Sequence, residues 1–289
     1  MAASFRFAIC NEIFGETPLD RVCEQVAALG YSGIELAPFT LGHDVAALGI
    51  ERRDSIRETI QKHGLEFVGL HWLLVGPEGL HASTRDESVR QRTWNYVHDL
   101  IDLCADLAGE GVSSPVMVFG SPKQRASEPG VSPKEATDLF VHELAHLAPH
   151  AEQRGVIVLL EALPLNQCDV VTSLSQAVCI LKQIGSPAVQ TMFDVHNAVD
   201  ETEPHTELVR KYAPYIRHVH VNELDGSEPG MRDYDFAALM RTLSDVHYGG
   251  WISVEAFDFT RKPSDIAQRS IERLKLSAQK RLTAKQNLV

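Results

Sequence analysis

The chain has 289 residues, of which 44% are hydrophobic and 23% are charged, and a formal net charge of −12 from 27 basic and 39 acidic side chains. This is an ordinary globular composition with enough length for a large core. Because nucleic-acid binding relies on clustered Lys and Arg, the acidic balance argues against a polyanionic partner and favours a small neutral or weakly charged substrate.

No apolar run approaches the roughly 18 residues that span a bilayer, and the N-terminus lacks the pattern of a signal peptide. We therefore expect a soluble protein without a membrane partner. The cysteines are odd in number and show no CxxC spacing, so neither disulfides nor a thiolate zinc site is indicated, and a cytoplasmic location is the simpler interpretation. They are Cys10, Cys23, Cys104, Cys168 and Cys179.

Short apolar runs alternate along the chain with amphipathic segments of helix length, which is typical of βαβ units and a parallel sheet. Helix ends carry the matching signals: Ser132 and Glu135 form a candidate capping box, while Gly30 and Gly64 suit left-handed residues after helices. The runs predict eight strands, over residues 5–10, 32–37, 66–74, 115–120, 156–163, 189–195, 216–221 and 251–257.

Eight such units without a linker or a break in composition predict one α/β domain over residues 1–289, a closed (β/α)8 TIM barrel. A doubly wound open sheet is the main alternative, and it is weakened because the glycine-rich phosphate loops of nucleotide-binding sheets are absent. Two long connections, residues 74–87 and 120–133, would lie on the C-terminal face of a barrel, where such enzymes hold their active sites.

Four polar residues interrupt apolar runs near the C-terminal ends of the last four strands: Glu161, Asp194, His220 and Glu255. An unpaired buried charge costs several kcal/mol, so each needs a partner, and neighbouring strands would bring the four together. This mostly oxygen donor set suits Mn²⁺, Mg²⁺ or Co²⁺, and Zn²⁺ is also compatible.

Alternate positions of the strand at 216–221 carry His218 and His220, followed by Asn222. Side chains two apart on a strand share a face, so these three line one side of it. From the residues alone, the pattern predicts either a polar core or half of a metal site.

The chain resembles the xylose isomerase-like TIM barrels, which include ketose 3-epimerases and hydroxypyruvate isomerase-like proteins. The resemblance runs through "ICNEIFG", "GYSGIEL", "LLEALPLN", "FDVHN", "HVHVNE", "PGMRDYDF" and "GGWISVEAF". In that family a Glu, Asp, His, Glu set from strands five to eight holds one divalent ion. The resemblance places this set on Glu161, Asp194, His220 and Glu255, with Mn²⁺ as the first choice of metal. His218 would then lie one layer deeper, and it and Asn222 would support the ligand or touch the substrate.

In that family the ion binds neighbouring carbonyl and hydroxyl oxygens of a sugar and acidifies the carbon between them. The resemblance therefore implies that one of Glu161 and Glu255 removes a proton, giving an enediolate, and that the other returns it. This apparatus fits a ketose 3-epimerase, and it also serves aldose-ketose isomerisation if the sugar binds one carbon further along. The resemblance further implies a homo-oligomer, either a dimer or a tetramer.

Substrate contacts are predicted at His71, Glu35, His196, Asn197 and Arg232. For Glu35 and His71, which lie on strands two and three, a sugar-hydroxyl contact and a place in a buried network are equally open.

Other candidates are weaker. Glu12, Trp72 and Phe257 could wall the pocket, although aromatic residues at strand ends commonly serve packing alone. Lys123 and Arg125 could meet a phosphate or carboxylate, but we interpret both as solvated loop charges.

The chain departs from the family pattern at three places that concern substrate recognition. Many ketose 3-epimerases have a His three residues after the strand-six Asp, where this chain has Asn197, and the His comes one residue earlier as His196. An Arg that several members carry beyond the metal-binding His is replaced by Gly226, and Arg232 is the candidate to substitute for it. The loop after strand five is longer than the usual EPxN arrangement and carries Asn166 further along.

Three alternatives to an isomerase remain. A metal-dependent lyase acting on a keto-inositol or 3-keto-glycoside would use the same residues. An AP-endonuclease-like nuclease needs further histidines, and this chain has Asp235 where one is required. A non-catalytic barrel would be expected to have lost at least one of the four ligands.

Overall fold

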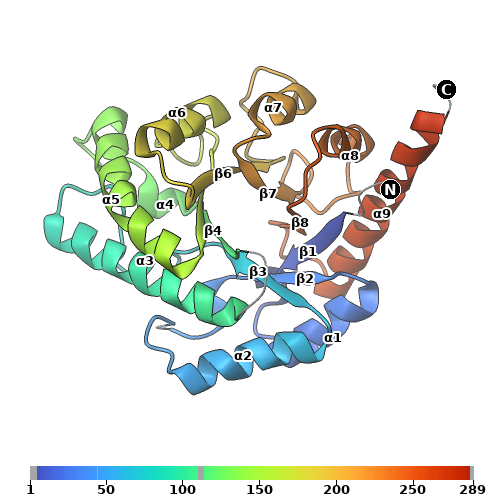
Figure 1. The fold of residues 1–289 in the computed structure, drawn as a ribbon, viewed down its shortest axis with the longest axis horizontal. Helices are drawn as coiled ribbons and strands as arrows, with labels where there is room; N and C mark the ends of the chain where they lie inside the picture. The colour runs from blue at the N-terminus through green and yellow to red at the C-terminus, as the bar shows by residue number, and fades with distance from the viewer. Residues whose placement is uncertain (1–4, 44, 110–113, 287–289) are drawn as a thin grey trace.

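The computed structural model describes residues 5–43, 45–109 and 114–286, and within them eight parallel strands close into a barrel in the order β1 to β8 (Figure 1). The predicted (β/α)8 barrel is confirmed, and each predicted strand segment contains one observed strand. The strands are β1 Arg6–Cys10, β2 Gly33–Leu36, β3 Glu66–Leu70, β4 Val116–Phe119, β5 Ile157–Leu160, β6 Val189–Asp194, β7 Ile216–Val221 and β8 Trp251–Val254.

Helices surround the barrel on its outside, as Figure 1 shows. The α-helices are α1 Leu19–Leu29, α2 Ile50–Lys62, α3 Glu87–Ala108, α4 Pro122–Arg125, α5 Pro133–Arg154, α6 Leu174–Ile184, α7 His205–Tyr212, α8 Phe236–Asp245 and α9 Pro263–Gln286. Two short 3-10 helices follow the first two strands, η1 Glu12–Phe14 and η2 Pro38–Thr40.

Helix ends follow the predicted chemistry with one exception. Ser132 caps α5 by accepting a hydrogen bond from the Glu135 backbone N–H at 3.2 Å. Gly30 and Gly64 adopt positive φ angles of 86° and 73°, as expected for residues that close helices. The predicted capping box is incomplete, because the Glu135 carboxylate forms a bidentate ion pair with Arg85. A charged guanidinium is a stronger partner than the backbone N–H it replaces.

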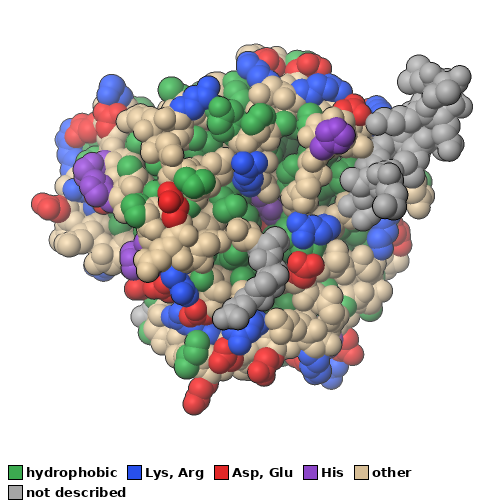
Figure 2. Space-filling model, in the orientation of Figure 1, with side chains coloured by type: hydrophobic (Ala, Val, Ile, Leu, Met, Phe, Trp, Pro, Cys, Tyr) green, Lys and Arg blue, Asp and Glu red, His purple; other side chains and the backbone are tan. Residues whose placement is uncertain are grey.

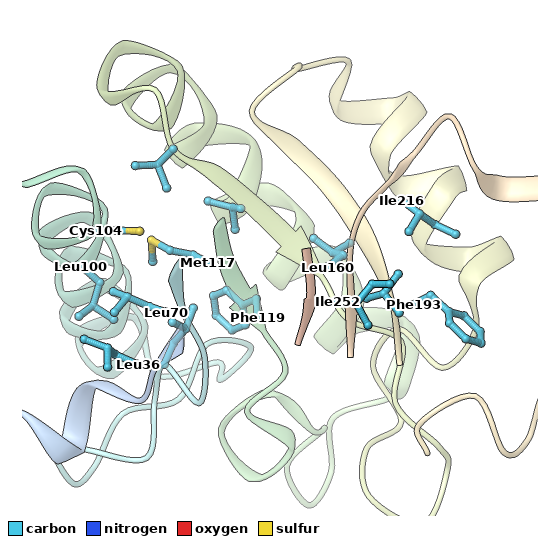
Figure 3. Packing of buried hydrophobic residues seen from close by; sticks show 14 of the residues in the cluster. Leu36, Leu70, Leu100, Cys104, Met117, Phe119, Leu160, Phe193, Ile216 and Ile252 are labelled. Carbon is cyan, nitrogen blue, oxygen red and sulfur yellow. The ribbon is translucent and has the colours of Figure 1, made fainter. Parts of the chain in front are cut away.

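Strand side chains alternate between two layers. Those that point outward pack against the helices, as with Leu70 and Met117, which lie beside Leu100 and Cys104 of α3 (Figure 3). Inward-pointing apolar side chains fill the N-terminal part of the barrel as a separate cluster of Ala8, Val68, Val116, Val118, Leu159, Met192 and Trp251. Polar side chains follow this cluster toward the C-terminal ends of the strands, so the barrel interior changes from apolar to polar along its axis.

The surface carries both basic and acidic side chains, as expected from the 27 basic and 39 acidic residues of the chain. In the view of Figure 2, Lys and Arg side chains are interspersed with Asp and Glu and form no continuous basic patch. All five cysteines are free, so the predicted absence of disulfides is confirmed. Among the described residues, no helix has both the length and the apolar character needed to cross a membrane.

Candidate active site

The four predicted metal ligands converge at the C-terminal end of the barrel. Glu161, Asp194, His220 and Glu255 are all buried, and each offers one ligand atom within 4.8 Å of those of the others. Strand pairing explains this convergence, because Asp194 is in register with His220 and the two glutamates directly follow β5 and β8 on either side. The set combines three carboxylates with one imidazole, which is a donor set for a divalent cation.

The two ring nitrogens of His220 have different surroundings. Nδ1 lies 3.0 Å from Glu255 Oε2 and 3.8 Å from Asp194 Oδ2, yet it is buried without a hydrogen bond. Nε2 lies on the other side of the ring, 3.1 Å from Glu35 Oε1. A buried nitrogen that faces carboxylates without a hydrogen bond fits a position in which it would bind a cation.

Burial and mutual repulsion shift the pKa values of the carboxyl groups. Burial, followed by the charges of Glu255 and Asp194, raises the pKa of Glu161 to about 8. Burial and the charge of Glu255 raise the pKa of Asp194 to about 6. Burial also opposes ionisation of Glu255, but the interaction with His220, the charge of His71 and the hydrogen bond from Trp72 together outweigh it and lower the Glu255 pKa. The protein alone therefore favours a proton at Glu161 at neutral pH.

Each glutamate of the set has one oxygen held by a neighbouring side chain. Asn197 donates from Nδ2 to Glu161 Oε1 at 2.9 Å. The Trp72 indole donates from Nε1 to Glu255 Oε1 at 2.7 Å. Both carboxylates are thereby fixed in orientation, and each keeps its second oxygen for another partner.

Asp194 is held from two sides. The Asn197 backbone N–H donates to Oδ1 at 2.6 Å, and Asn222 donates from Nδ2 to Oδ2 at 3.1 Å. Asn222 also accepts a hydrogen bond from the backbone N–H of His196 at 2.8 Å. The predicted supporting role of Asn222 thus has a structural basis, since it connects β7 to the residues after β6.

A buried polar network lies beneath the ligand set. Glu35 Oε2 contacts His218 Nε2 at 2.9 Å, and the same carboxylate contacts His220. His71 Nε2 lies 2.7 Å from Glu12 Oε2, and His71 Nδ1 lies 3.6 Å from Glu35. Burial opposes the charge of Glu35, but the two β7 histidines outweigh it and hold its pKa well below the usual range. Glu35 and His71 are fully buried, so the network position is the one that the structure supports.

A cavity of about 580 Å³ opens directly above this network. Of the four ligand residues, Glu161 and Glu255 line it, whereas Asp194 and His220 lie beneath. The predicted substrate residues His196 and Asn197 also line the cavity, together with Trp72, Lys123, Gln167 and Phe257.

Gln167 is a lining residue that sequence reasoning missed. It donates from Nε2 to Asn197 Oδ1 at 3.3 Å, whereas Asn166, the residue singled out from the sequence, is exposed. No local sequence signal indicates which of these two neighbouring loop residues faces the cavity.

Two arginines that the sequence analysis considered for substrate binding do not line the cavity. Arg232 is exposed and donates from Nε to Asp225 Oδ2 at 2.8 Å, outside the cavity lining, so its substrate contact remains a prediction.

The interpretation of Arg125 as a solvated loop charge was wrong. Its side chain is fully buried, donates from Nη1 to the Phe119 carbonyl at 2.6 Å and lies over the Phe140 ring. The carbonyl satisfies Nη1 and the aromatic ring faces the guanidinium, whereas Nε and Nη2 have no hydrogen-bond partner among the described residues.

The turn after β7 has room for Gly226 but not for the Arg that the family resemblance led us to expect there. Gly226 has a φ of +80°, and a Cβ there would lie 2.9 Å from the Phe257 ring and 3.6 Å from the His196 ring. A larger residue would meet both strain and collision. The His196 ring itself faces the cavity, with Nδ1 2.8 Å from the Leu224 carbonyl.

The model of the xylose isomerase-like TIM barrel family matches residues 23–277, most of the chain. The chain belongs to this family. The resemblance noted from the sequence motifs is confirmed.

The relatives of this chain include sugar epimerases and putative isomerases. The fructoselysine 3-epimerase of Escherichia coli O157:H7 is 24% identical over 268 residues, which cover 89% of this chain and 93% of that protein. A putative hydroxypyruvate isomerase of Streptomyces coelicolor is 25% identical, covering 84% of this chain and 87% of that one. Epimerases are isomerases, so these relatives agree with the predicted enzyme class.

Two solved structures share the fold. An L-ribulose 3-epimerase superposes with a TM-score of 0.82 at 19% identity, covering 99% of this chain and 98% of that one. A 3-keto-D-glucoside 4-epimerase from E. coli has a TM-score of 0.80 at 17% identity, with 94% and 100% covered.

The nuclease alternative finds no support at Asp235. Its side chain caps α8 by accepting a hydrogen bond from the Ala238 backbone N–H at 2.9 Å. The residue that would have to be a further metal ligand therefore has a helix-capping role.

Proposed function

We propose that this protein is a divalent-metal-dependent sugar isomerase that moves a proton on a carbon next to a carbonyl, as a ketose 3-epimerase does. One observation carries the proposal. Within a buried set of four ligands, the two glutamates line the cavity and the Asp and His lie beneath it. The groups that can reach both a cation and a substrate are therefore two carboxylates, as proton transfer in both directions requires.

The residues present fit a divalent cation. Three carboxylates within ligand distance of one another repel, and the unpaired His220 Nδ1 completes a set that a positive charge would satisfy. When bound, the cation supplies charge neutralisation and polarises oxygens next to the reacting carbon. The oxygen-rich set favours Mn²⁺ first, with Mg²⁺, Co²⁺ and Zn²⁺ also compatible.

In this proposal Glu161 and Glu255 share the proton transfer. One carboxylate accepts the proton from the substrate carbon, and the other delivers a proton to the same or the neighbouring carbon. Asn197 and Trp72 keep the two groups oriented through their hydrogen bonds. His196, Asn197 and Gln167 are placed to contact sugar hydroxyls from the same wall of the cavity.

The test is incorporation of solvent deuterium. Metal-loaded protein in D₂O is incubated with ketoses, ketose phosphates and keto-glycosides, and mass spectrometry follows the sugar. We expect a gain of deuterium at the carbon next to the carbonyl in at least one class. A lyase would instead release a leaving group, which the same spectra reveal, and no exchange in any class would refute the proposal.

Glu35 is expected to act as a positioning residue for His220. A buried carboxylate on the far nitrogen of a ligating imidazole fixes the ring and raises its basicity, and its loss costs about 10–100-fold in metal affinity. We predict this weakening of Mn²⁺ binding for Glu35→Gln, measured by isothermal titration calorimetry. Glu12→Gln is the matched comparison because Glu12 contacts His71. Equal Mn²⁺ affinity in the wild type and Glu35→Gln would remove this role.

Gly120 leaves the space that the Glu161 carboxylate occupies. A Cβ at this position would lie 2.2 Å from Glu161 Oε2, so the carboxylate would have to move. We predict that Gly120→Ala weakens Mn²⁺ binding by about tenfold or more. Gly249→Ala is the control, since its Cβ would meet nothing within 4 Å. Unchanged binding in Gly120→Ala would show that Glu161 is not needed where the structure places it.

A further inference from the structure

Exposed apolar side chains are concentrated on the face of the barrel that carries the cavity. Among the described residues, six of the eight exposed large hydrophobic side chains follow β2, β3, β5, β6, β7 and β8, on the C-terminal face. The six are Phe39, Val75, Leu165, Val199, Leu224 and Phe259. A contiguous exposed apolar surface marks a binding site, whereas scattered apolar side chains need no explanation. Val75 lines the cavity, and Val199 and Leu224 line a different pocket.

An aromatic wall connects this rim to the candidate catalytic groups. It begins at Trp72, whose indole holds Glu255, and Phe257 stacks on Trp72 at 6.2 Å with an interplanar angle of 13°. The ring centroid of Phe39 lies 6.0 Å from that of Trp72, and the ring centroid of Phe259 lies 6.2 Å from that of Trp72. Phe39 and Phe259 are 39% and 53% exposed, so the outer end of the wall is open to a ligand.

The backbone of Trp72 supports a binding role. Its φ of +51° is a left-handed conformation that bulky side chains rarely adopt. Such strain persists where the surrounding structure enforces it, commonly at ligand sites. Here it sets the ring between the Glu255 carboxylate and the apolar rim.

The charge of the cavity argues against a phosphorylated sugar. Lys123 is the single Lys or Arg among the described residues that line it. Phosphate sites rely on several donors, often with a bidentate Arg. At about 580 Å³ the cavity is of the size that takes drug-sized ligands, which leaves room beyond one monosaccharide.

We infer that the substrate is a keto-glycoside with an aromatic aglycone, its carbonyl on a ring carbon other than the anomeric one, and that the aglycone binds against Trp72, Phe39 and Phe259. The inference rests on the proposed function for the placement of the sugar at Glu161 and Glu255. Aromatic rings gain from stacked or edge-on contact with one another, and the wall offers both kinds of surface. A free or phosphorylated monosaccharide would leave this apolar wall exposed to water.

The experiment compares two ligands that differ only in the aglycone. Phenyl β-D-glucoside and methyl β-D-glucoside are titrated into Mn²⁺-loaded protein and followed by saturation-transfer NMR, which also reports which ligand protons touch the protein. We expect the phenyl compound to bind about tenfold or more tightly, with the strongest saturation on its ring protons. The double variant Phe39→Ala/Phe259→Ala should remove most of that preference, whereas Ile50→Ala/Leu276→Ala, which removes exposed apolar groups from α2 and α9, should keep it.

Equal affinities for the two glucosides, including no binding of either, would overturn the inference. So would a preference that survives in Phe39→Ala/Phe259→Ala. If sedimentation shows that this variant dissociates an oligomer and no aryl preference is found, the rim is a contact between copies of the chain. Absence of deuterium exchange would count against the proposed function, and it is measured separately from the preference for the phenyl compound. Trp72→Phe adds a further distinction, because it should keep the aryl preference and lose the hydrogen bond to Glu255.

Discussion

Replacement of Glu161 or Glu255 by Gln is expected to lower turnover by about 10³-fold or more, within the range that a positioned acid or base contributes to catalysis. Glutamine keeps the size of the side chain but cannot accept and return the proton. It is also a weaker cation ligand. Both glutamates line the cavity, so the loss should appear in deuterium exchange as well as in net conversion.

Glu66→Gln is the matched control. Glu66 begins β3 at the opposite end of the barrel, where it is exposed and 3.8 Å from Arg6. This variant should exchange deuterium at the wild-type rate. Near-full activity in either Glu161→Gln or Glu255→Gln would refute the role assigned to that residue.

Removal of the metal should have the second large effect. With Mn²⁺ at 100 times its dissociation constant, binding adds about 2.7 kcal/mol to the free energy of unfolding. For a chain of this length that corresponds to a rise in Tm of roughly 4–5 °C over chelator-treated protein. Differential scanning calorimetry measures it. A stable, metal-free protein whose Tm does not respond to Mn²⁺ would contradict the metal site.

The pKa of Glu161 gives this binding a pH dependence. In the metal-free protein its pKa is raised to about 8, so at pH 7 the group is mostly protonated. A ligand carboxyl must ionise to bind a cation, so binding at pH 7 should release about one proton and affinity should increase as pH rises toward about 8. Calorimetric titration in two buffers with different ionisation heats gives the number of protons. Release at pH 7 that is no greater than at pH 9 would contradict this assignment.

The same shift predicts an effect on stability. Since the folded pKa of Glu161 exceeds the unfolded value of 4.5, the folded state binds this proton more tightly, and its stabilising contribution is lost as pH rises from about 4.5 through about 8. Glu161→Gln does not titrate. Without metal, the variant should therefore become more stable than the wild type at pH 8.5, by an amount on the order of a few kcal/mol, while binding Mn²⁺ more weakly. Chemical denaturation at pH 5 and pH 8.5 compares the two proteins.

The sequence by itself determined the fold and the group of candidate metal ligands. Apolar runs at helix-length intervals can bury both of their faces only in a parallel sheet covered by helices, and eight of them close into a barrel. Polar residues at the ends of consecutive strands must then meet at one end of that barrel, which is why Glu161, Asp194, His220 and Glu255 could be named as a group.

Only the tertiary structure decided which contacts are made by the residues around the four candidate ligands. Whether Glu35 contacts a sugar or a histidine depends on its depth in the barrel, and strand alternation gives the face of a side chain without giving that depth. The burial of Arg125 and the choice of Gln167 over Asn166 depend on the path of loops, which short polar segments do not specify. The aromatic wall is assembled from the ends of three different strands, with the Trp72 ring set by a left-handed backbone. Contacts between residues far apart in the chain fix that arrangement, and they exist only once the barrel has closed.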